Sequence, residues 1–330
     1  MPVVLITPEE MLHKETSYVE ILREAGFEIE YPADPTFARG LCSEEETIRQ
    51  LSVCDAIIAG GEFFTETVLS ALPKLRIIAR SGVGYDRVDL AAATARSIPV
   101  TITPTANFDA VAETAIALLM AVAKSIVLND RRARGDWERR MTRPVRGSTL
   151  GLFGLGRIGR AVAIRAKGLG MQVLACETHP DQQFVKEQGI ELVDFDRLLG
   201  ESDYLSIHCP LNQETEGLFD RNVFARMKPD AVLINTARGP IVAEADLTEA
   251  LRSGQLHAAG LDVMEQEPPA SDNPLLQLDN VVLSPHIGGE DTLSSEMMGI
   301  EAATCIVDLK RGHWPQGAVV NDELQQDWTW

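Results

Sequence analysis

Three side chains that can bind a carboxylate and move a proton follow three separate apolar runs in the second half of the chain. Arg238 comes after VLINTA, Glu267 a few residues after GLDV, and His286 directly after VVLSP. Arginine binds a carboxylate through two parallel hydrogen bonds, and histidine exchanges a proton near neutral pH. A carboxylate beside a histidine stabilises its protonated form and fixes its orientation. These residue types predict acid–base chemistry on a substrate that carries a carboxylate.

Each of the three residues also has an ordinary structural interpretation. Arg238 could form a surface ion pair, Glu267 could be an exposed loop acid before Pro268, and His286 could be a hydrogen-bonded histidine at a strand end. Taken singly, the structural interpretation is the commoner one. The catalytic prediction depends on all three residues following a dinucleotide-binding motif in this order, at strand ends that converge on one crevice.

That motif consists of Gly154, Gly156 and Gly159. It follows the β-rich run 149–153 and opens the helical segment 157–169, which is the strand–turn–helix context that the motif requires. Glycine permits the tight turn, the close approach of the backbone to a pyrophosphate, and close packing of the helix on the strand. The positive end of the helix then binds the pyrophosphate.

An acidic residue stands where the adenosine ribose is expected. The run 171–176 predicts a second strand, and Glu177 follows it at close to the spacing of about 20 residues that separates the last glycine from such an acid. A carboxylate there accepts hydrogen bonds from ribose hydroxyls and repels a 2′-phosphate. Because the next three residues include no arginine that could bind a 2′-phosphate, we expect NAD rather than NADP. The alternative interpretation of Glu177 is an exposed loop acid that binds no cofactor.

Short β-rich runs alternate with helical segments twice along the chain. From residue 1 to about 103 the β-rich runs are VVLI, FEIEY, DAIIA, LRIIA and PVTI, and from 150 to 285 they are GLFG, QVLAC, IELV, YLSIHC, AVLINTA, AAGLDV and VVLSPH. Such alternation predicts parallel sheets covered by helices on both faces. The predicted fold is therefore α/β, with two doubly wound parallel-sheet domains.

Three further segments connect or extend these domains. Residues 107–128 have apolar side chains at helical spacing, and Asn107 can cap the first turn. The arginine-rich segment 129–147 contains Trp137 and is predicted to be an arm that packs on a second subunit, because arginine and aromatic residues are enriched at interfaces; the alternative is a solvated loop. A helix predicted at 290–311 is expected to return to the first domain.

The composition argues against several classes of partner. Lys and Arg number 30 and Asp and Glu 49, so the net charge is −19, which repels nucleic acid and anionic lipid. The five cysteines show no C-x-x-C spacing, so we expect a reduced protein without a metal site. No secretion signal opens the sequence, and the apolar stretch 115–123 is too short to span a bilayer, so a cytoplasmic location is expected.

Seven segments resemble the D-isomer-specific 2-hydroxyacid dehydrogenases, the family of D-lactate, glycerate and D-3-phosphoglycerate dehydrogenases. They are RSGVGYDRVD, NFDAVAETAIALLM, LGLFGLGRIGR, HCPL, NTARGPIV, LDVMEQEP and SPHIGG. The resemblance implies an NAD-dependent enzyme that interconverts a small D-2-hydroxy acid and its 2-oxo acid. It also implies a flavodoxin-like substrate domain of residues 1–103 plus 286–330, a Rossmann cofactor domain of residues 104–285, and an active site between them.

The same resemblance implies the roles of single residues. Arg238 binds the substrate carboxylate and carbonyl, His286 is the acid and base, and Glu267 is its partner. Backbone N–H groups of Ser81, Gly82, Val83 and Gly84 are expected to bind the same carboxylate. The predicted cofactor-binding residues are Gly154, Gly156, Arg157, Ile158, Gly159, Glu177, His208, Cys209, Pro210, Thr236, Ala237, Asp262 and Gly288.

The choice of substrate within the family rests on the segment after the third predicted strand. Phosphoglycerate dehydrogenases typically carry an arginine there, whereas this chain has Gly60, Gly61 and Glu62. We therefore favour a glyoxylate or hydroxypyruvate type of substrate over 3-phosphoglycerate, although Arg39, Lys74, Arg80 or an arginine of a partner's arm could replace the missing one.

Other activities remain as alternatives. Glu267 argues against formate as the substrate, because formate dehydrogenases usually have glutamine there, whereas phosphite dehydrogenases keep all three catalytic residue types. A protein of another class, an NAD-sensing corepressor, would retain the same site for binding alone.

We expect a homodimer with a small-molecule substrate.

Overall fold

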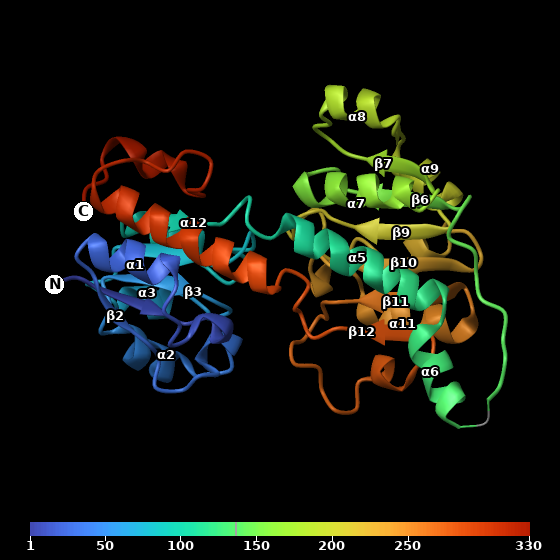
Figure 1. The fold of residues 1–330 in the computed structure, drawn as a ribbon, viewed down its shortest axis with the longest axis horizontal. Helices are drawn as coiled ribbons and strands as arrows, with labels where there is room; N and C mark the ends of the chain where they lie inside the picture. The colour runs from blue at the N-terminus through green and yellow to red at the C-terminus, as the bar shows by residue number, and fades with distance from the viewer. Residues whose placement is uncertain (136) are drawn as a thin grey trace. The chain divides into compact units, whose positions relative to one another are not determined.

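The chain forms two compact α/β units, seen in a computed structural model that describes residues 1–135 and 137–330. Unit 1 comprises Met1–Asn107 and Glu290–Trp330, and unit 2 comprises Phe108–Gly289 (Figure 1). Both boundaries between the units lie four residues later than predicted: the first unit ends at 107 rather than 103, and the second ends at 289 rather than 285. Residues 104–107 belong to unit 1, where the Thr105 backbone N–H donates to Glu301, and residues 286–289 belong to unit 2, where they are bonded to Asp262.

Unit 1 is built on a five-stranded parallel sheet in the order β2-β1-β3-β4-β5. The strands are β1 (Val3–Ile6), β2 (Glu28–Glu30), β3 (Ala56–Ala59), β4 (Ile77–Arg80) and β5 (Val100–Thr101). Every residue of β3 and β4 is buried, as expected for central strands covered on both faces.

Five α-helices and short 3-10 turns cover this sheet. They are α1 (Ser17–Glu24), α2 (Glu44–Leu51), α3 (Glu66–Ser70), α4 (Leu90–Ala95) and α12 (Thr292–Lys310). α1 and α12 pack side by side on one face around Tyr18 and Met298, and Figure 1 shows the red helix α12 beside the blue helix α1. α2, α3 and α4 cover the other face. The helix predicted at 290–311 thus returns to the first unit.

The chain after α12 closes the edge of this sheet at β5. Val319 forms an antiparallel bridge with Thr101, and Asn321 is fully buried. The Asn321 amide accepts from Val100 N–H at 2.9 Å and donates to the Ile98 carbonyl at 2.9 Å and the Thr94 hydroxyl at 3.1 Å. One side chain therefore joins the tail to α4, β5 and the turn between them.

We predict that Asn321→Ala destabilises unit 1. The substitution leaves the N–H of Val100 and the carbonyl of Ile98 without a hydrogen-bond partner, which costs about 1–3 kcal/mol for each buried group. Urea unfolding followed by tryptophan fluorescence should show a lower midpoint, whereas Gln325→Ala, at an exposed position of the same tail, should leave it unchanged. Equal midpoints for the two variants would contradict the role given to Asn321.

Unit 2 contains a seven-stranded parallel sheet in the order β12-β11-β10-β9-β6-β7-β8. The strands are β6 (Thr149–Phe153), β7 (Gln172–Cys176), β8 (Glu191–Leu192), β9 (Tyr204–Ile207), β10 (Ala231–Asn235), β11 (Leu256–Leu261) and β12 (Val281–Leu283). The chain builds outward from β6 to β8, crosses to β9 on the other side of β6, and continues to β12. The strand order thus reverses between β6 and β9, which is where open α/β sheets bind their ligands.

Helices cover both faces of this sheet as well. They are α5 (Phe108–Ala123), α6 (Ile126–Arg134), α7 (Arg157–Gly168), α8 (Gln182–Gln188), α9 (Phe195–Glu201), α10 (Arg221–Phe224) and α11 (Glu244–Ser253). α5 and α7 pack on one face, and α9, α10 and α11 pack on the other. The predicted fold class, two parallel sheets with helices on both faces, is confirmed.

The helix predicted at 107–128 was wrong in two details. It breaks at Ser125, which has a left-handed φ of 47°, and α5 and α6 meet at a bend of 51°. Asn107 is buried and its side-chain carbonyl has no hydrogen-bond partner in the described part of the chain, so the predicted cap does not form. Its side chain lies beside the turn at Gly82 instead.

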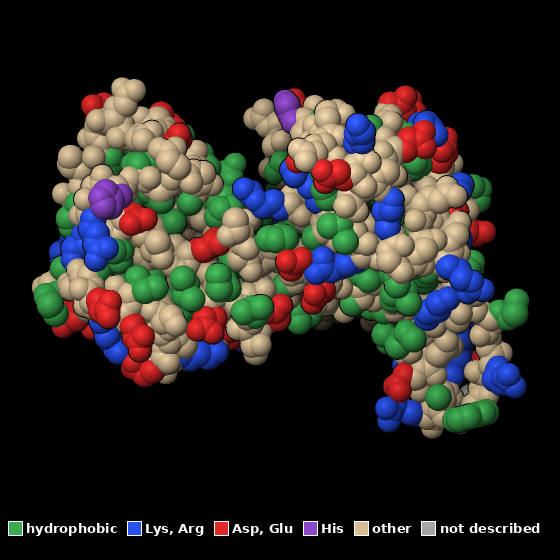
Figure 2. Space-filling model, turned by 45° about the horizontal axis from the view of Figure 1, so that its top comes forward, with side chains coloured by type: hydrophobic (Ala, Val, Ile, Leu, Met, Phe, Trp, Pro, Cys, Tyr) green, Lys and Arg blue, Asp and Glu red, His purple; other side chains and the backbone are tan. Residues whose placement is uncertain are grey.

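α6 and the chain after it project from the body of unit 2. The predicted arm at 129–147 includes residue 136, which lies outside the described residues. Ile126, Val127, Trp137 and Met141 are exposed there, and Figure 2 shows hydrophobic and basic side chains together on this projection. In the described ranges no single helix is long and apolar enough to cross a membrane, although α5 and α6 pass that test as a bent pair.

Candidate active site

The glycine turn brings the ends of β6 and β9 into direct backbone contact. Gly154 has a φ of +101°, and a Cβ on it would lie 2.8 Å from the carbonyl carbon and oxygen of His208. A Cβ on Gly159 would lie 2.3 Å from the Gly154 carbonyl oxygen. A Cβ on Gly156, by contrast, would meet no atom within 4 Å. The first and third glycines thus permit the packing, and the space at the second one, where α7 begins, is open to a ligand.

Glu177 is tied to this turn by its carboxylate. Oε2 accepts from Leu155 N–H at 2.7 Å, and Oε1 accepts from His179 N–H at 3.0 Å. Partial burial by itself raises the pKa of Glu177, but the two backbone N–H groups outweigh it and hold the pKa below its usual value. The carboxylate is therefore ionised at neutral pH. Its remaining lone pairs can accept hydrogen bonds from ribose hydroxyls.

His208 and Cys209, at the end of β9, are held uncharged. Burial lowers the pKa of His208 to about 4, and its Nε2 lies 2.8 Å from the Ser206 hydroxyl. Burial raises the pKa of the Cys209 thiol to about 12, so this cysteine is not a nucleophile. The next residue, Pro210, is exposed.

Thr236 and Ala237 directly follow β10. This strand lies beside β9, whose end contacts the glycine turn. The Thr236 side chain is buried, and its hydroxyl has no hydrogen-bond partner in the part of the chain that the structure describes. A buried hydroxyl of this kind fits a hydrogen bond to a bound group. The open space at Gly156, the ionised Glu177 and the Thr236 hydroxyl together fit a dinucleotide.

His286 and Glu267 form a direct hydrogen bond. His286 Nδ1 lies 2.7 Å from Glu267 Oε2, and the other oxygen of Glu267 accepts from Met264 N–H at 3.0 Å. The Glu267 side chain is 22% exposed and the His286 side chain 42%. Because Glu267 engages Nδ1, the second ring nitrogen of His286, Nε2, points to the opposite side of the ring. This is the arrangement of an acid–base histidine oriented by a carboxylate.

Asp262 positions the segment that carries His286. It follows β11 and is 3% exposed. Its backbone carbonyl accepts from His286 N–H at 2.8 Å, and its carboxylate accepts from Ile287 N–H at 3.2 Å and Gly288 N–H at 2.8 Å. These bonds hold His286 at a left-handed φ of 55°. Asp262 and Gly288 were predicted to bind the cofactor, and that role stays a prediction; in the structure they bond to each other within the segment that carries His286.

Arg238 lies on a loop that packs against the chain leading to Glu267. A Cβ on Gly239 would lie 2.0 Å from the Met264 carbonyl oxygen, so no larger residue fits there. Asn235, at the end of β10, accepts from Ala237 N–H at 3.0 Å and donates to the Arg238 carbonyl at 2.9 Å. We did not predict Asn235 from the sequence. The sequence contained a signal for it, because an asparagine ends an otherwise apolar run.

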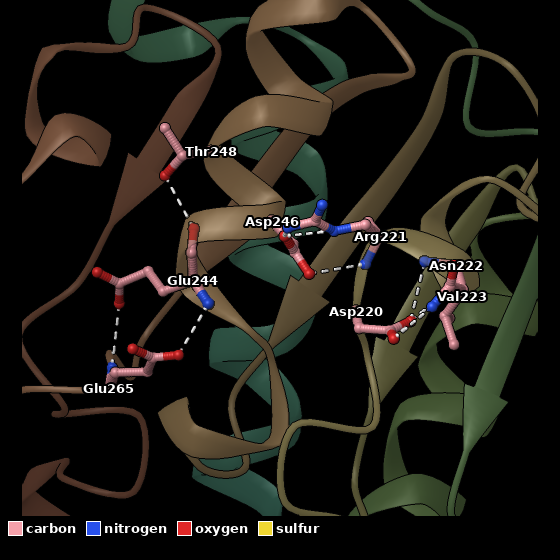
Figure 3. A network of polar contacts seen from close by, with 8 residues as sticks. All are labelled: Asp220, Arg221, Asn222, Val223, Glu244, Asp246, Thr248 and Glu265. Carbon is pink, nitrogen blue, oxygen red and sulfur yellow. Dashed lines mark hydrogen bonds and ion pairs between the residues drawn. The ribbon is translucent and has the colours of Figure 1, made fainter.

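A second unpredicted contact holds the loop before Glu267 to the start of α11. Glu244 N–H donates to the Glu265 carboxylate at 2.8 Å, and Glu265 N–H donates to the Glu244 carboxylate at 3.1 Å, as Figure 3 shows. Figure 3 also shows the neighbouring pair of Arg221 and Asp246, which joins α10 to the same helix. The loop that carries Glu267 is therefore fixed to the start of α11 at Glu265.

The predicted substrate loop Ser81–Gly84 lies in unit 1, at the carboxyl end of β4. Gly82 has a φ of +126°, and its N–H donates to the Thr103 hydroxyl at 2.8 Å. Arg80 Nε donates to the Gly84 carbonyl at 3.1 Å. Among the described residues, no group of three or more His, Cys, Asp and Glu side chains forms a metal site.

Comparison with known proteins decides the family. The model of the D-isomer specific 2-hydroxyacid dehydrogenase NAD binding domain matches residues 116–288. A glyoxylate reductase of Korarchaeum cryptofilum is 41% identical over 293 residues, which are 86% of this chain and 87% of that protein. The chain belongs to the D-isomer-specific 2-hydroxyacid dehydrogenase family. The predicted resemblance is thus confirmed, and with it an NAD-binding domain.

Other relatives differ in length and name. A D-3-phosphoglycerate dehydrogenase of Archaeoglobus fulgidus is 41% identical over 298 residues, which are 89% of this chain but 55% of that protein. The chain therefore spans about half the length of that relative. Among solved structures, the TT0316 protein from Thermus thermophilus has a TM-score of 0.84 at 34% identity over 96% of this chain and 99% of its own. An acyclic imino acid reductase in complex with NADPH and D-Arg also has a TM-score of 0.84, at 28% identity over 97% and 100%.

We predict that Gly288→Ala lowers turnover more than stability. The added Cβ would lie 2.5 Å from the Asp262 carboxylate, so the bonds that position His286 must shift. We expect kcat to fall at least tenfold, since a displacement of about 1 Å of a catalytic group can cost about 10²-fold. The melting temperature should fall by only a few degrees.

Gly168→Ala is the matched control, because a Cβ at that helical position would meet no atom within 4 Å. It should leave turnover unchanged and should not lower the melting temperature, since alanine is favoured over glycine within a helix. Wild-type turnover in Gly288→Ala would show that the position of His286 does not depend on these bonds.

Proposed function

We propose that this chain is an NAD-dependent oxidoreductase that interconverts a small D-2-hydroxy acid and its 2-oxo acid. The observation that carries the proposal is the 2.7 Å hydrogen bond between His286 and Glu267, in a family whose name describes this chemistry. The Gly154–Gly159 turn, Glu177 and Thr236 would hold NAD, which supplies or accepts the hydride when bound. The chain's own residues provide orientation, charge and a proton.

In the reducing direction, Arg238 binds the substrate carboxylate and polarises the 2-oxo group as negative charge develops on its oxygen. Protonated His286 delivers the proton from Nε2 to that oxygen, and Glu267 stabilises the charged imidazole before the transfer. In the oxidising direction, neutral His286 takes the proton from the hydroxyl. Of the predicted substrate loop, the N–H groups of Ser81 and Gly82 are already bonded, to the Ala59 carbonyl and the Thr103 hydroxyl. The role of Val83 and Gly84 as further carboxylate binders is part of the same proposal and follows from the family resemblance.

The preferred substrate carries no phosphate. Glu62 is a buried acid after β3, and Arg39 forms an ion pair with Glu9. Arg80 is buried and donates to Gly84, while Lys74 lies in the turn before β4, at the opposite end of the sheet from Glu62. None of these three cations of unit 1 is placed as a phosphate ligand. The glyoxylate reductases among the relatives support this choice, and the 41% identity to a D-3-phosphoglycerate dehydrogenase keeps that activity as the second candidate.

We also propose a homodimer in which the segment 129–147 packs on the partner. The exposure of Trp137 at 74% and of Met141 at 100% supports it, because large apolar side chains with arginines around them are typical of interfaces. A cytoplasmic location remains a prediction from the sequence.

We predict that NADH drives reduction of glyoxylate or hydroxypyruvate at a higher kcat/KM than reduction of 3-phosphohydroxypyruvate. The measurement is a survey of 2-oxo acids with NADH and with NADPH, followed by the absorbance of the reduced cofactor. An imine of a 2-oxo acid belongs in the panel because of the imino acid reductase neighbour. A preference for NADPH would refute the role of Glu177, and NADH binding without reduction of any substrate would favour a sensor protein.

We predict that His286→Ala lowers kcat by about 10²–10⁴-fold, the usual contribution of general acid–base catalysis. Its affinity for NADH should stay at the wild-type value, because His286 lies outside the residues proposed to hold the cofactor. His257→Ala, on β11 of the same unit, is the control and should keep wild-type turnover. Full activity of the His286 variant would remove this residue from the mechanism.

A further inference from the structure

The fold brings an arginine of α7 to the loop that carries Glu177, although none stands among the three residues after that acid. Arg160 lies in the first turn of α7, directly after the last glycine of the turn. Its Nε–H donates to the Leu155 carbonyl at 3.2 Å. The N–H of the same leucine donates to Glu177 Oε2 at 2.7 Å. A base and an acid therefore hold the two polar backbone groups of one residue, and the guanidinium lies beside the proposed ribose site.

Asp181 binds this guanidinium at the other end of the loop. Its Oδ2 accepts from Arg160 Nη1 at 2.8 Å. The guanidinium carbon lies 5.6 Å from the centre of the Phe184 ring. The other oxygen, Oδ1, accepts from the N–H groups of Gln183 and Phe184, both at 3.1 Å, and thereby caps α8. The two oxygens of Asp181 thus have separate roles, because one caps a helix and the other holds Arg160.

This ion pair bears on a cofactor that carries a phosphate on the 2′-oxygen of its adenosine. Such a phosphate has more than one negative charge at neutral pH, and Glu177 already places a carboxylate at the ribose. Asp181 adds a second repulsive charge at the end of the same loop. Arginine binds a phosphate through two parallel hydrogen bonds, but the guanidinium of Arg160 is bound by an acid instead.

We propose that Asp181 is a specificity-determining residue for the cofactor: by binding Arg160, it withholds from a 2′-phosphate the cation that would attract it. Release of Arg160 turns this edge of the ribose site into a subsite for that phosphate. This inference rests on the proposed role of Glu177 at the ribose. It differs from a purely structural role, because it concerns the preference for one cofactor over the other and not the affinity for both.

The test is Asp181→Asn. Asparagine keeps an oxygen that can cap α8, since Asn and Asp cap helices about equally well, but it loses the charge and the acceptor that hold Arg160. We expect the ratio of kcat/KM for NADPH to kcat/KM for NADH to rise about tenfold, the effect of one hydrogen bond to a charged group. The ratio of the two Kd values should change in the same direction, and the melting temperature should stay at the wild-type value.

Asp220→Asn is the matched control. Asp220 caps α10 in the same way, because its Oδ1 accepts from the N–H groups of Asn222 and Val223, both at 2.9 Å. The substitution removes one negative charge from unit 2 and keeps the cap. It should therefore leave the preference between NADPH and NADH unchanged.

Two further variants keep the test decisive. Arg160→Gln in the Asp181→Asn background removes the released guanidinium, so the double variant should lose the gain with NADPH. Asp181→Ser also keeps a capping oxygen and takes the place of Asp181→Asn if that variant does not fold.

A competition measurement needs no substrate. Adenosine 2′,5′-bisphosphate and AMP are each titrated against bound NADH, whose fluorescence reports its displacement. Asp181→Asn should bind the bisphosphate about tenfold more tightly than the wild-type chain does, the same factor as for NADPH, and AMP with unchanged affinity.

An unchanged cofactor preference in Asp181→Asn would overturn the inference. So would a gain with NADPH that survives in the double variant, because Arg160 would then take no part in it. Equal losses of affinity for both cofactors together with a lower melting temperature would also overturn it, since that pattern indicates structure alone. If the wild-type chain binds NADH but reduces no 2-oxo acid, the proposed reaction fails, and the competition between the two adenosine nucleotides still tests Asp181.

Discussion

The hydrogen bonds between the Asp262 carboxylate and the backbone of residues 287–288 are the constraint on which the site depends. His286 stands at a left-handed φ, a conformation that a side chain of its size adopts only where the surroundings impose it. Asp262 can impose it because β11 is a central strand, paired in parallel with β10 and β12. Arg238, Glu267 and His286 then follow the carboxyl ends of three adjacent strands. The fixed distance between neighbouring strands of the sheet therefore sets how the three residues are spaced.

The electrostatics of unit 2 are local, since the whole chain carries a net charge of −19 and the proposed ligands are anions. In the proposed function, the positive end of α7, the exposed backbone at Gly156 and the guanidinium of Arg238 supply the attraction for these anions. Burial keeps His208 neutral close to the glycine turn, while hydrogen bonds keep Glu177 charged beside it. The proposed recognition of the cofactor therefore depends on directed N–H groups rather than on an overall positive surface.

The central strands of both sheets were predictable from the sequence because they are buried on both faces and read as short apolar runs. The candidate catalytic residues were selected for a related reason: polar residues that follow such runs stand at the edge of the sheet where ligands bind. The contacts of Asp262 and Glu244 were not predictable, because these side chains act on backbone groups of other loops, and no spacing rule encodes such pairs. The break at Ser125 and the burial of Asn107 also depend on tertiary packing, which overrides local helical preference.

The interruption of unit 1 by unit 2 has a consequence for synthesis of the chain on the ribosome. Residues 1–107 emerge first, yet one face of their sheet is covered by α12, which emerges only after all of unit 2. Until then Tyr18, Val19 and Leu22 on α1 lack the helix against which they pack. Unit 2 is continuous in sequence and can complete its core before α12 is synthesised and packs on the first segment. The order in which the two cores close is therefore the reverse of the order in which the polypeptide begins them.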